Sequence, residues 1–120
     1  MRESRVHTRV NYRVKLWCYY YYGDNGERHK FEMPISMEVF DVSLGGVGVV
    51  TRLPFPKKST LEFTFYLEDI PYQVLTQVKW HTTNNIFHRY GMEIIGHNNM
   101  LFRHLQHFVK GENIMTPDVL

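Results

Sequence analysis

Cysteine occurs only once in the 120 residues, at Cys18, so an intrachain disulfide is impossible and a reducing compartment is expected. No apolar run approaches the length of a membrane span, and the amino end shows no hydrophobic signal-peptide segment. These absences predict a cytoplasmic protein without membrane insertion.

A dominant charge is missing as well. The chain has 14 basic and 12 acidic residues, a formal net charge of +2, which is too small to attract DNA or RNA over the whole surface. No basic stripe interleaved with aromatic residues follows the expected strands, which argues against a barrel that binds single-stranded nucleic acid. Any anion site must therefore be local.

Patterns typical of catalysis and of metal binding are also absent. Ser43 has no histidine near it in sequence and precedes two glycines rather than standing in a G-x-S-x-G elbow, and no paired carboxylates suggest acid–base chemistry. His97, His104 and His107 have helical spacing, but no carboxylate or thiol accompanies them at ligand spacing. We therefore expect a non-enzyme without a metal site, with these histidines in solvent.

Short segments of alternating apolar residues make up most of the chain. A hydrophobic content of 43% predicts one globular domain. We expect a mainly β fold, a six-stranded antiparallel barrel, because short strands recur at regular spacing. From Asn99 the period becomes helical and Gly111 ends it, which predicts a C-terminal α-helix. The expected strands are 10–22, 30–40, 47–51, 61–67, 72–80 and 87–95, with turns at 23–26 and 82–85.

The same patterns divide the chain into three parts. Residues 1–9 form an arginine-rich arm that we expect to be flexible, residues 10–111 form the barrel with its helix, and residues 112–120 form a loose tail. Within the barrel, Pro34 should lie at an edge or a bulge and Cys18 should be buried. Trp80 continues the inner parity of its strand, which favours a core indole over a ring that stacks on a bound base.

The stretch Asp41-Val42-Ser43-Leu44-Gly45-Gly46 interrupts a clean strand pattern. The alternation from Met33 to Val39 places Asp41 on the apolar parity, where a carboxylate needs a hydrogen-bond partner. One possible partner of the carboxylate is a backbone amide two residues later in the chain, in a local turn in which Gly45 and Gly46 take positive φ. A bound ligand offers the other.

Arg5 and Arg9 stand four residues apart just ahead of the first strand. In an extended segment their Cα atoms would lie roughly 13 Å apart, a span that suits a ligand with several acceptors. Arginine binds phosphate and the O6/N7 edge of guanine in bidentate fashion. A carboxylate such as Asp41 accepts from the N1–H and the exocyclic amine of guanine. Together these groups indicate a guanine nucleotide site.

The R-x-x-x-R of Arg5 to Arg9, followed by the D-x-S-x-x-G of Asp41, Ser43 and Gly46, resembles the PilZ domain family. Val78-Lys79-Trp80 and Tyr90-Gly91-Met92-Glu93-Ile94 resemble later strands of the family, and the likeness covers about residues 2 to 110. The resemblance implies a β-barrel receptor for the bacterial second messenger cyclic di-GMP and no other cofactor. The implied ligand-binding residues are Arg5, Arg9, Asp41, Ser43 and Gly46, with Arg2, Ser4, Gly45 and Trp80 as further candidates.

Many family members have a second arginine directly ahead of the motif, whereas here Ser4 precedes Arg5 and the extra arginine is Arg2. In the family that position influences ligand stoichiometry, so the resemblance allows either one bound ligand or a stacked pair. It also allows either a monomer or a ligand-dependent dimer. The resemblance implies that the ligand orders the arm and that an unidentified protein effector in motility, exopolysaccharide or biofilm control responds. The alternative is a degenerate family member that binds protein without nucleotide.

Overall fold

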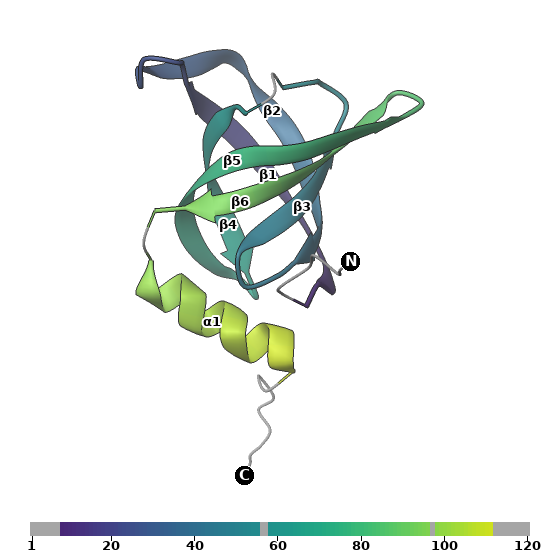
Figure 1. Ribbon diagram of the computed structural model, residues 1–120, viewed down its shortest axis with the longest axis vertical. Coiled ribbons are helices and arrows are strands. Elements are labelled where there is room, and N and C mark those ends of the chain that lie inside the picture. The colour runs from purple at the N-terminus through teal and green to yellow at the C-terminus, as the bar shows by residue number, and fades with distance from the viewer. Residues whose placement is uncertain (1–7, 56–57, 97, 112–120) are drawn as a thin grey trace, which may run out of the picture.

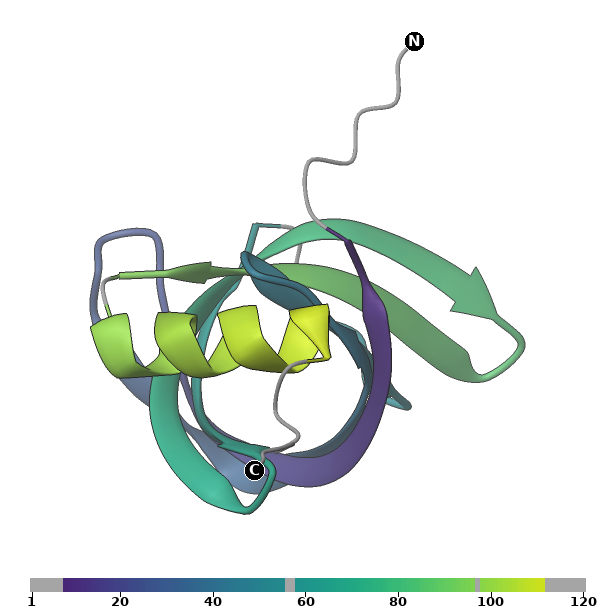
Figure 2. The same cartoon turned by 90° about the horizontal axis from the view of Figure 1, so that it is seen from below.

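The chain folds into a closed six-stranded antiparallel barrel with one C-terminal helix, as predicted (Figure 1). The computed structural model describes residues 8–55, 58–96 and 98–111. Around the barrel the strands follow the order β1-β2-β3-β6-β5-β4. The elements are β1 (Val10–Tyr22), β2 (Arg28–Val42), β3 (Gly46–Thr51), β4 (Thr60–Leu67), β5 (Ile70–Asn84), β6 (Phe87–Ile95) and α1 (Asn99–Lys110). Figure 2 shows α1 lying across one open end of the barrel.

The predicted turn at 82–85 is wrong, because β5 continues to Asn84. Thr82, Thr83 and Asn84 pair with residues of β6, and threonine fits a pleated surface well. The chain turns instead at Asn85, which has a φ of 57°, and Ile86. The result is a long β5–β6 hairpin that projects beyond the barrel (Figures 1 and 2).

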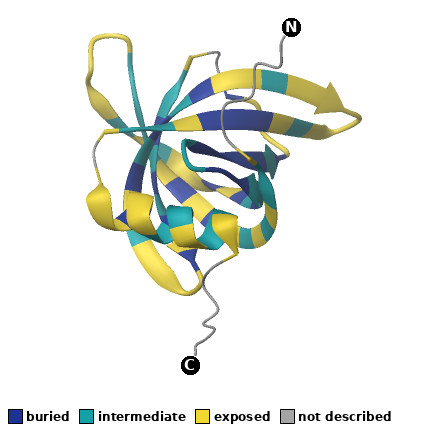
Figure 3. Ribbon diagram, turned by 60° about the horizontal axis from the view of Figure 1, so that its bottom comes forward, coloured by how far each residue is buried: buried dark blue, intermediate teal, exposed yellow. Residues whose placement is uncertain are grey.

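Buried positions are interspersed with more exposed ones along the barrel strands (Figure 3). The buried positions form one hydrophobic core, and most of them belong to the predicted apolar parity of their strand. In β4, Leu61, Phe63, Phe65 and Leu67 are all 2% exposed or less. Cys18 in β1 is fully buried, and burial raises the pKa of its thiol to about 11. The thiol is therefore protonated at neutral pH, as expected for a small core residue rather than a nucleophile.

Two β-bulges decide which later residues face outward. One extra residue interrupts the pairing of β2 with β3 between Val39 and Asp41, and another interrupts β5 with β6 between Val78 and Trp80. Since an extra residue reverses the side of the sheet that later side chains face, Val42 is buried in place of Asp41. Trp80 is 40% exposed, so the prediction of a core indole is wrong.

Pro34 lies in a third irregular stretch, between Lys30 and Ile35 of β2, as its missing donor predicts. Met33, in the same stretch, is exposed although the alternation placed it on the inner parity.

Helix α1 begins at Asn99 and is followed by Gly111, as predicted. Asn98 accepts a hydrogen bond from the Leu101 amide, and Gly111 ends the helix with a φ of 74°. His104 is not in solvent as expected: its ring nitrogens lie 2.8 Å from the Tyr72 hydroxyl and 2.9 Å from a Glu68 carboxylate oxygen. These contacts fasten the helix to β5 and to the turn before it. Within the described residues, no helix combines the length and apolar character needed to cross a membrane.

Candidate functional site

An ion pair joins the two motifs that the sequence analysis assigned to one site. Arg9 Nη1 lies 3.0 Å from Asp41 Oδ1, and the two side chains are 27% and 16% exposed. The pair forms because Asn11 in β1 is the register partner of Asp41 in β2, so the chain passes the carboxylate just before β1 begins. The partner of the Asp41 carboxylate is therefore the Arg9 guanidinium.

The turn from Ser43 to Gly46 connects β2 to β3 beside this ion pair. The Ser43 amide donates to the Gly46 carbonyl oxygen at 2.9 Å, and the Ser43 hydroxyl donates to the same oxygen at 3.5 Å. The Ile94 amide of β6 donates to the Gly45 carbonyl oxygen at 2.9 Å. Ser43 is buried, so its hydroxyl stabilises the turn from within and the turn holds the end of β2 in place.

The expectation that Gly45 and Gly46 take positive φ is wrong. Among the described glycines, positive φ occurs at Gly26, Gly96 and Gly111. Gly46 is needed for another reason: a Cβ at this position would collide with the Met92 carbonyl oxygen of β6. Close approach of two strands, rather than backbone conformation, selects glycine here.

A row of paired residues crosses four strands on the outside of the barrel, starting from Asp41. Asp41 pairs with Gly48 of β3, Gly48 with Gly91 of β6, and Gly91 with Trp80 of β5. With neighbouring strands about 4.8 Å apart, the row spans roughly 14 Å. We call Arg9 together with this row the outer face.

The two glycines let the flanking side chains lie against the sheet. A Cβ at Gly48 would meet the Asp41 carboxylate and the Phe40 ring, and a Cβ at Gly91 would meet the indole of Trp80. The middle of the outer face is therefore recessed, with the Asp41 carboxylate and Arg9 at one end and the exposed Trp80 ring at the other. Such a surface suits a flat, polar ligand.

A second cation, Arg89, lies beside the outer face. The Arg89 guanidinium carbon lies 4.3 Å from the centroid of the Phe40 ring, a cation–π contact. Phe40 is the extra residue of the β2 bulge, and Arg89 stands two residues before Gly91, on the same side of β6. These two residues share a hollow of about 430 Å³ with Asn11, Tyr12 and Arg13. Glycines inside strands could have indicated close packing at this face, but no pattern in the sequence marks Phe40 or Arg89.

The candidate residues thus fall into three groups. Arg9, Asp41 and Trp80 lie on the outer face, while Ser43, Gly45 and Gly46 form the supporting turn. Arg2, Ser4 and Arg5 lie outside the described residues. The exposed groups of this face offer hydrogen-bond donors, a carboxylate acceptor and a stacking surface, which is the chemistry of binding.

Comparisons with known proteins agree with this fold. The sequence matches the family described as PilZ domain over residues 2–111. A search of curated proteins finds no match.

Three solved structures of low sequence identity share the fold. YcgR of Escherichia coli in complex with c-di-GMP has a TM-score of 0.64 and 13% identity, over 92% of this chain and 46% of that one. The Bacillus subtilis inhibitor of motility MotI/DgrA has a TM-score of 0.67 and 15% identity, over 96% and 54%. The K. pneumonia MrkH–c-di-GMP complex has a TM-score of 0.57 and 16% identity, over 93% and 53%. The present chain spans about half the length of these three.

Proposed function

The chain belongs to the PilZ domain family, and on that premise we propose that it is a receptor that binds cyclic di-GMP on the outer face without turning it over. The observation that carries this proposal is the ion pair of Arg9 with Asp41 at the start of the row that ends at Trp80. YcgR and MrkH, which share the fold, were solved in complex with c-di-GMP.

Each group on the outer face has a role that follows from its chemistry. The Asp41 carboxylate accepts from the N1–H and exocyclic amine of one guanine, and Arg9 donates to the opposite edge or to a phosphate. The exposed Trp80 ring stacks on a base, an interaction of about 1–3 kcal/mol. The turn formed by Ser43, Gly45 and Gly46 keeps Asp41 in position.

Calorimetric titration with cyclic di-GMP tests this assignment. Arg9→Ala removes a charge-assisted contact of about 1.5–3 kcal/mol, so we expect affinity to fall about ten- to hundredfold. Asp41→Asn keeps the shape but replaces one acceptor oxygen with an NH₂ donor and removes the charge, and it should weaken binding similarly. A matched control is Glu62→Gln, which changes a carboxylate on the outside of β4, a strand that the outer face does not include, and should leave affinity unchanged.

The same titration tests the guanine assignment. Cyclic di-AMP should bind much more weakly, because adenine leaves the guanine-matched groups unpaired. Equal heats from both dinucleotides would refute guanine recognition. Absence of any heat with cyclic di-GMP would instead favour the alternative, an interaction module that binds protein without nucleotide.

The output of the receptor belongs to the same proposal. We place Arg5 on the ligand together with Arg9, with Arg2 and Ser4 beside them, so that binding orders residues 1–9 and a protein effector in motility, exopolysaccharide or biofilm control responds in the cytoplasm. Amide exchange in residues 1–9 should slow when cyclic di-GMP is added. Light scattering with and without ligand separates a monomer from a ligand-dependent dimer, and the heat per chain separates one ligand from a stacked pair.

A further inference from the structure

Two histidines meet on the β5–β6 hairpin, on the side of the sheet opposite to Trp80. His81 Nε2 lies 2.9 Å from His88 Nδ1, and both side chains are half-buried. They are diagonal neighbours of the antiparallel ladder, since His81 pairs with Tyr90 and His88 pairs with Thr83. We propose that this pair is a chelating site for a divalent transition-metal ion of the Cu²⁺ or Ni²⁺ class.

The two nitrogens stand at an ordinary hydrogen-bond distance, which is also short enough for both of them to bind one ion. Imidazole nitrogens bind such ions at about 2.0–2.1 Å, so two neighbouring ligands at 90° are about 2.9 Å apart. In a tetrahedral site with the same bond length the two nitrogens would be about 3.3 Å apart. The 2.9 Å separation is set by the hydrogen bond between the rings, and it lies close to the distance between two adjacent ligands of one ion. The choice of ion follows from the ligand type, because two imidazoles bind Cu²⁺, and after it Ni²⁺, more tightly than the earlier divalent metals of the first row.

The hairpin also fixes one of the two rings. The His81 ring stacks on Tyr90 with a centroid distance of 4.4 Å and an interplanar angle of 12°. Tyr90 is fully buried, and its hydroxyl accepts a hydrogen bond of 2.6 Å from the Phe55 amide. One ligand is thus held by a rigid neighbour before any ion binds, which lowers the entropic cost of chelation.

Binding requires a particular pair of tautomers. His81 carries its proton on Nδ1 and His88 carries its proton on Nε2, so that both facing nitrogens offer a lone pair to the ion. In the hydrogen-bonded pair one facing nitrogen carries a proton, and this proton must move through water to the other nitrogen of the same ring before the ion binds. Two bonds to the ion then replace the hydrogen bond between two neutral rings, and no net proton is released. No group of three or more histidine, cysteine or acidic side chains gathers within residues 8–55, 58–96 and 98–111, so water fills the remaining positions.

Titration of the EDTA-treated full chain with Cu²⁺ tests the site. We expect one equivalent to bind with quenching of tryptophan fluorescence, because Trp80 directly precedes His81. Electron paramagnetic resonance should show hyperfine coupling to two nitrogens. His88→Gln should weaken binding at least tenfold and remove one nitrogen from the spectrum.

Two further variants separate the site from other effects. His81→Gln should weaken Cu²⁺ binding equally, and its melting temperature shows whether loss of the Tyr90 contact has disturbed folding; His88→Gln avoids that contact. His29→Gln, which changes a histidine on the β1–β2 hairpin, should bind Cu²⁺ as the wild type does. The proposal is overturned if His88→Gln keeps wild-type affinity and spectrum, because the ion then binds elsewhere on the chain.

Discussion

Gly91 has no side chain because the indole of Trp80 occupies the space where a Cβ would project. Gly91→Ala must therefore displace the ring, and we expect unfolding free energy to fall by about 1–3 kcal/mol through overpacking. If Trp80 stacks on the ligand, affinity for cyclic di-GMP should fall as well. Denaturant unfolding, tryptophan emission and calorimetry measure the three effects.

A matched control for this substitution is Gly23→Ala in the β1–β2 turn. A Cβ there would meet only side-chain atoms, of which the nearest belongs to His29 at 3.3 Å. Unchanged emission and stability in Gly91→Ala would contradict the packing of the indole over this glycine.

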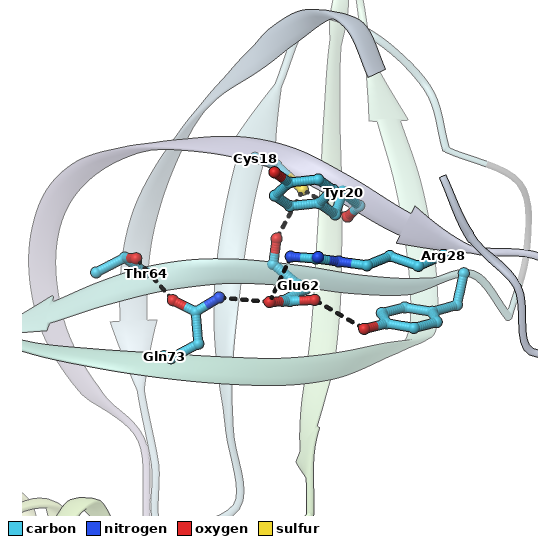
Figure 4. A network of polar contacts seen from close by, with 7 residues as sticks. Cys18, Tyr20, Arg28, Glu62, Thr64 and Gln73 are labelled. Carbon is cyan, nitrogen blue, oxygen red and sulfur yellow. Dashed lines mark hydrogen bonds and ion pairs between the residues drawn. The ribbon is translucent and has the colours of Figure 1, made fainter. Parts of the chain in front are cut away.

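The Glu62 carboxylate on β4 accepts hydrogen bonds from side chains of three other strands (Figure 4). It accepts hydrogen bonds from the Tyr22 hydroxyl at 2.8 Å, from Gln73 at 2.6 Å and from Arg28 at 3.2 Å. Burial alone would raise the pKa of this carboxyl, but the donors outweigh it and the pKa is lowered. The charged form is therefore stabilised by folding.

The pH dependence of stability follows from this shift. The contribution of Glu62 should be complete above the ordinary carboxyl pKa, about 4.3, and should be lost as pH falls through the lower folded value. Glu62→Gln should cost about 1–2 kcal/mol at pH 7 and flatten the acid limb of the stability curve. Urea unfolding from pH 7 to pH 3 measures this, and parallel acid limbs for both proteins would contradict it.

Helix α1 is held across the barrel end by buried Leu101 and Leu105 and by the polar contacts of His104. His104→Gln cannot reach both Tyr72 and Glu68 in the same geometry, so we expect a loss of about 1–2 kcal/mol and faster amide exchange in the helix. Met100→Gln, a strongly exposed position on the same helix, is the control and should change both quantities little. Equal exchange in the two variants would show that apolar packing alone holds the helix.

The positions of whole strands could be predicted from the sequence more reliably than the side of the sheet that single residues face. Alternation located every strand of the barrel, because side-chain parity and burial are coupled in a half-buried strand. It assigned the wrong side to Trp80 and Asp41, because each follows one extra residue, Lys79 or Phe40, that composition does not mark. The chemistry of Arg9 and Asp41 was enough to assign them to one site. The row that joins them to Trp80 depends on the register of β2, β3, β6 and β5, and short-range sequence patterns carry no information about that register.

For the whole molecule, the closed barrel means that the outer face exists only when β1, β2, β3, β5 and β6 are assembled. Cyclic di-GMP should therefore bind the folded chain and stabilise it by linkage. At a free concentration one hundred times its dissociation constant, the gain is about 2.7 kcal/mol. For a domain of this size that corresponds to a rise in melting temperature of roughly 10 °C.

Variants turn this linkage into a test of where the ligand binds. At the same ligand concentration Arg9→Ala, with a ten- to hundredfold weaker affinity, should gain only about 0.4–1.4 kcal/mol, so its melting temperature should rise by half as much or less. Glu62→Gln should start from a lower melting temperature yet rise by the wild-type amount, because its defect lies in the fold and not in the outer face. Equal rises in wild type and Arg9→Ala would place the ligand elsewhere on the barrel, since a contact that is lost without effect on linkage takes no part in binding.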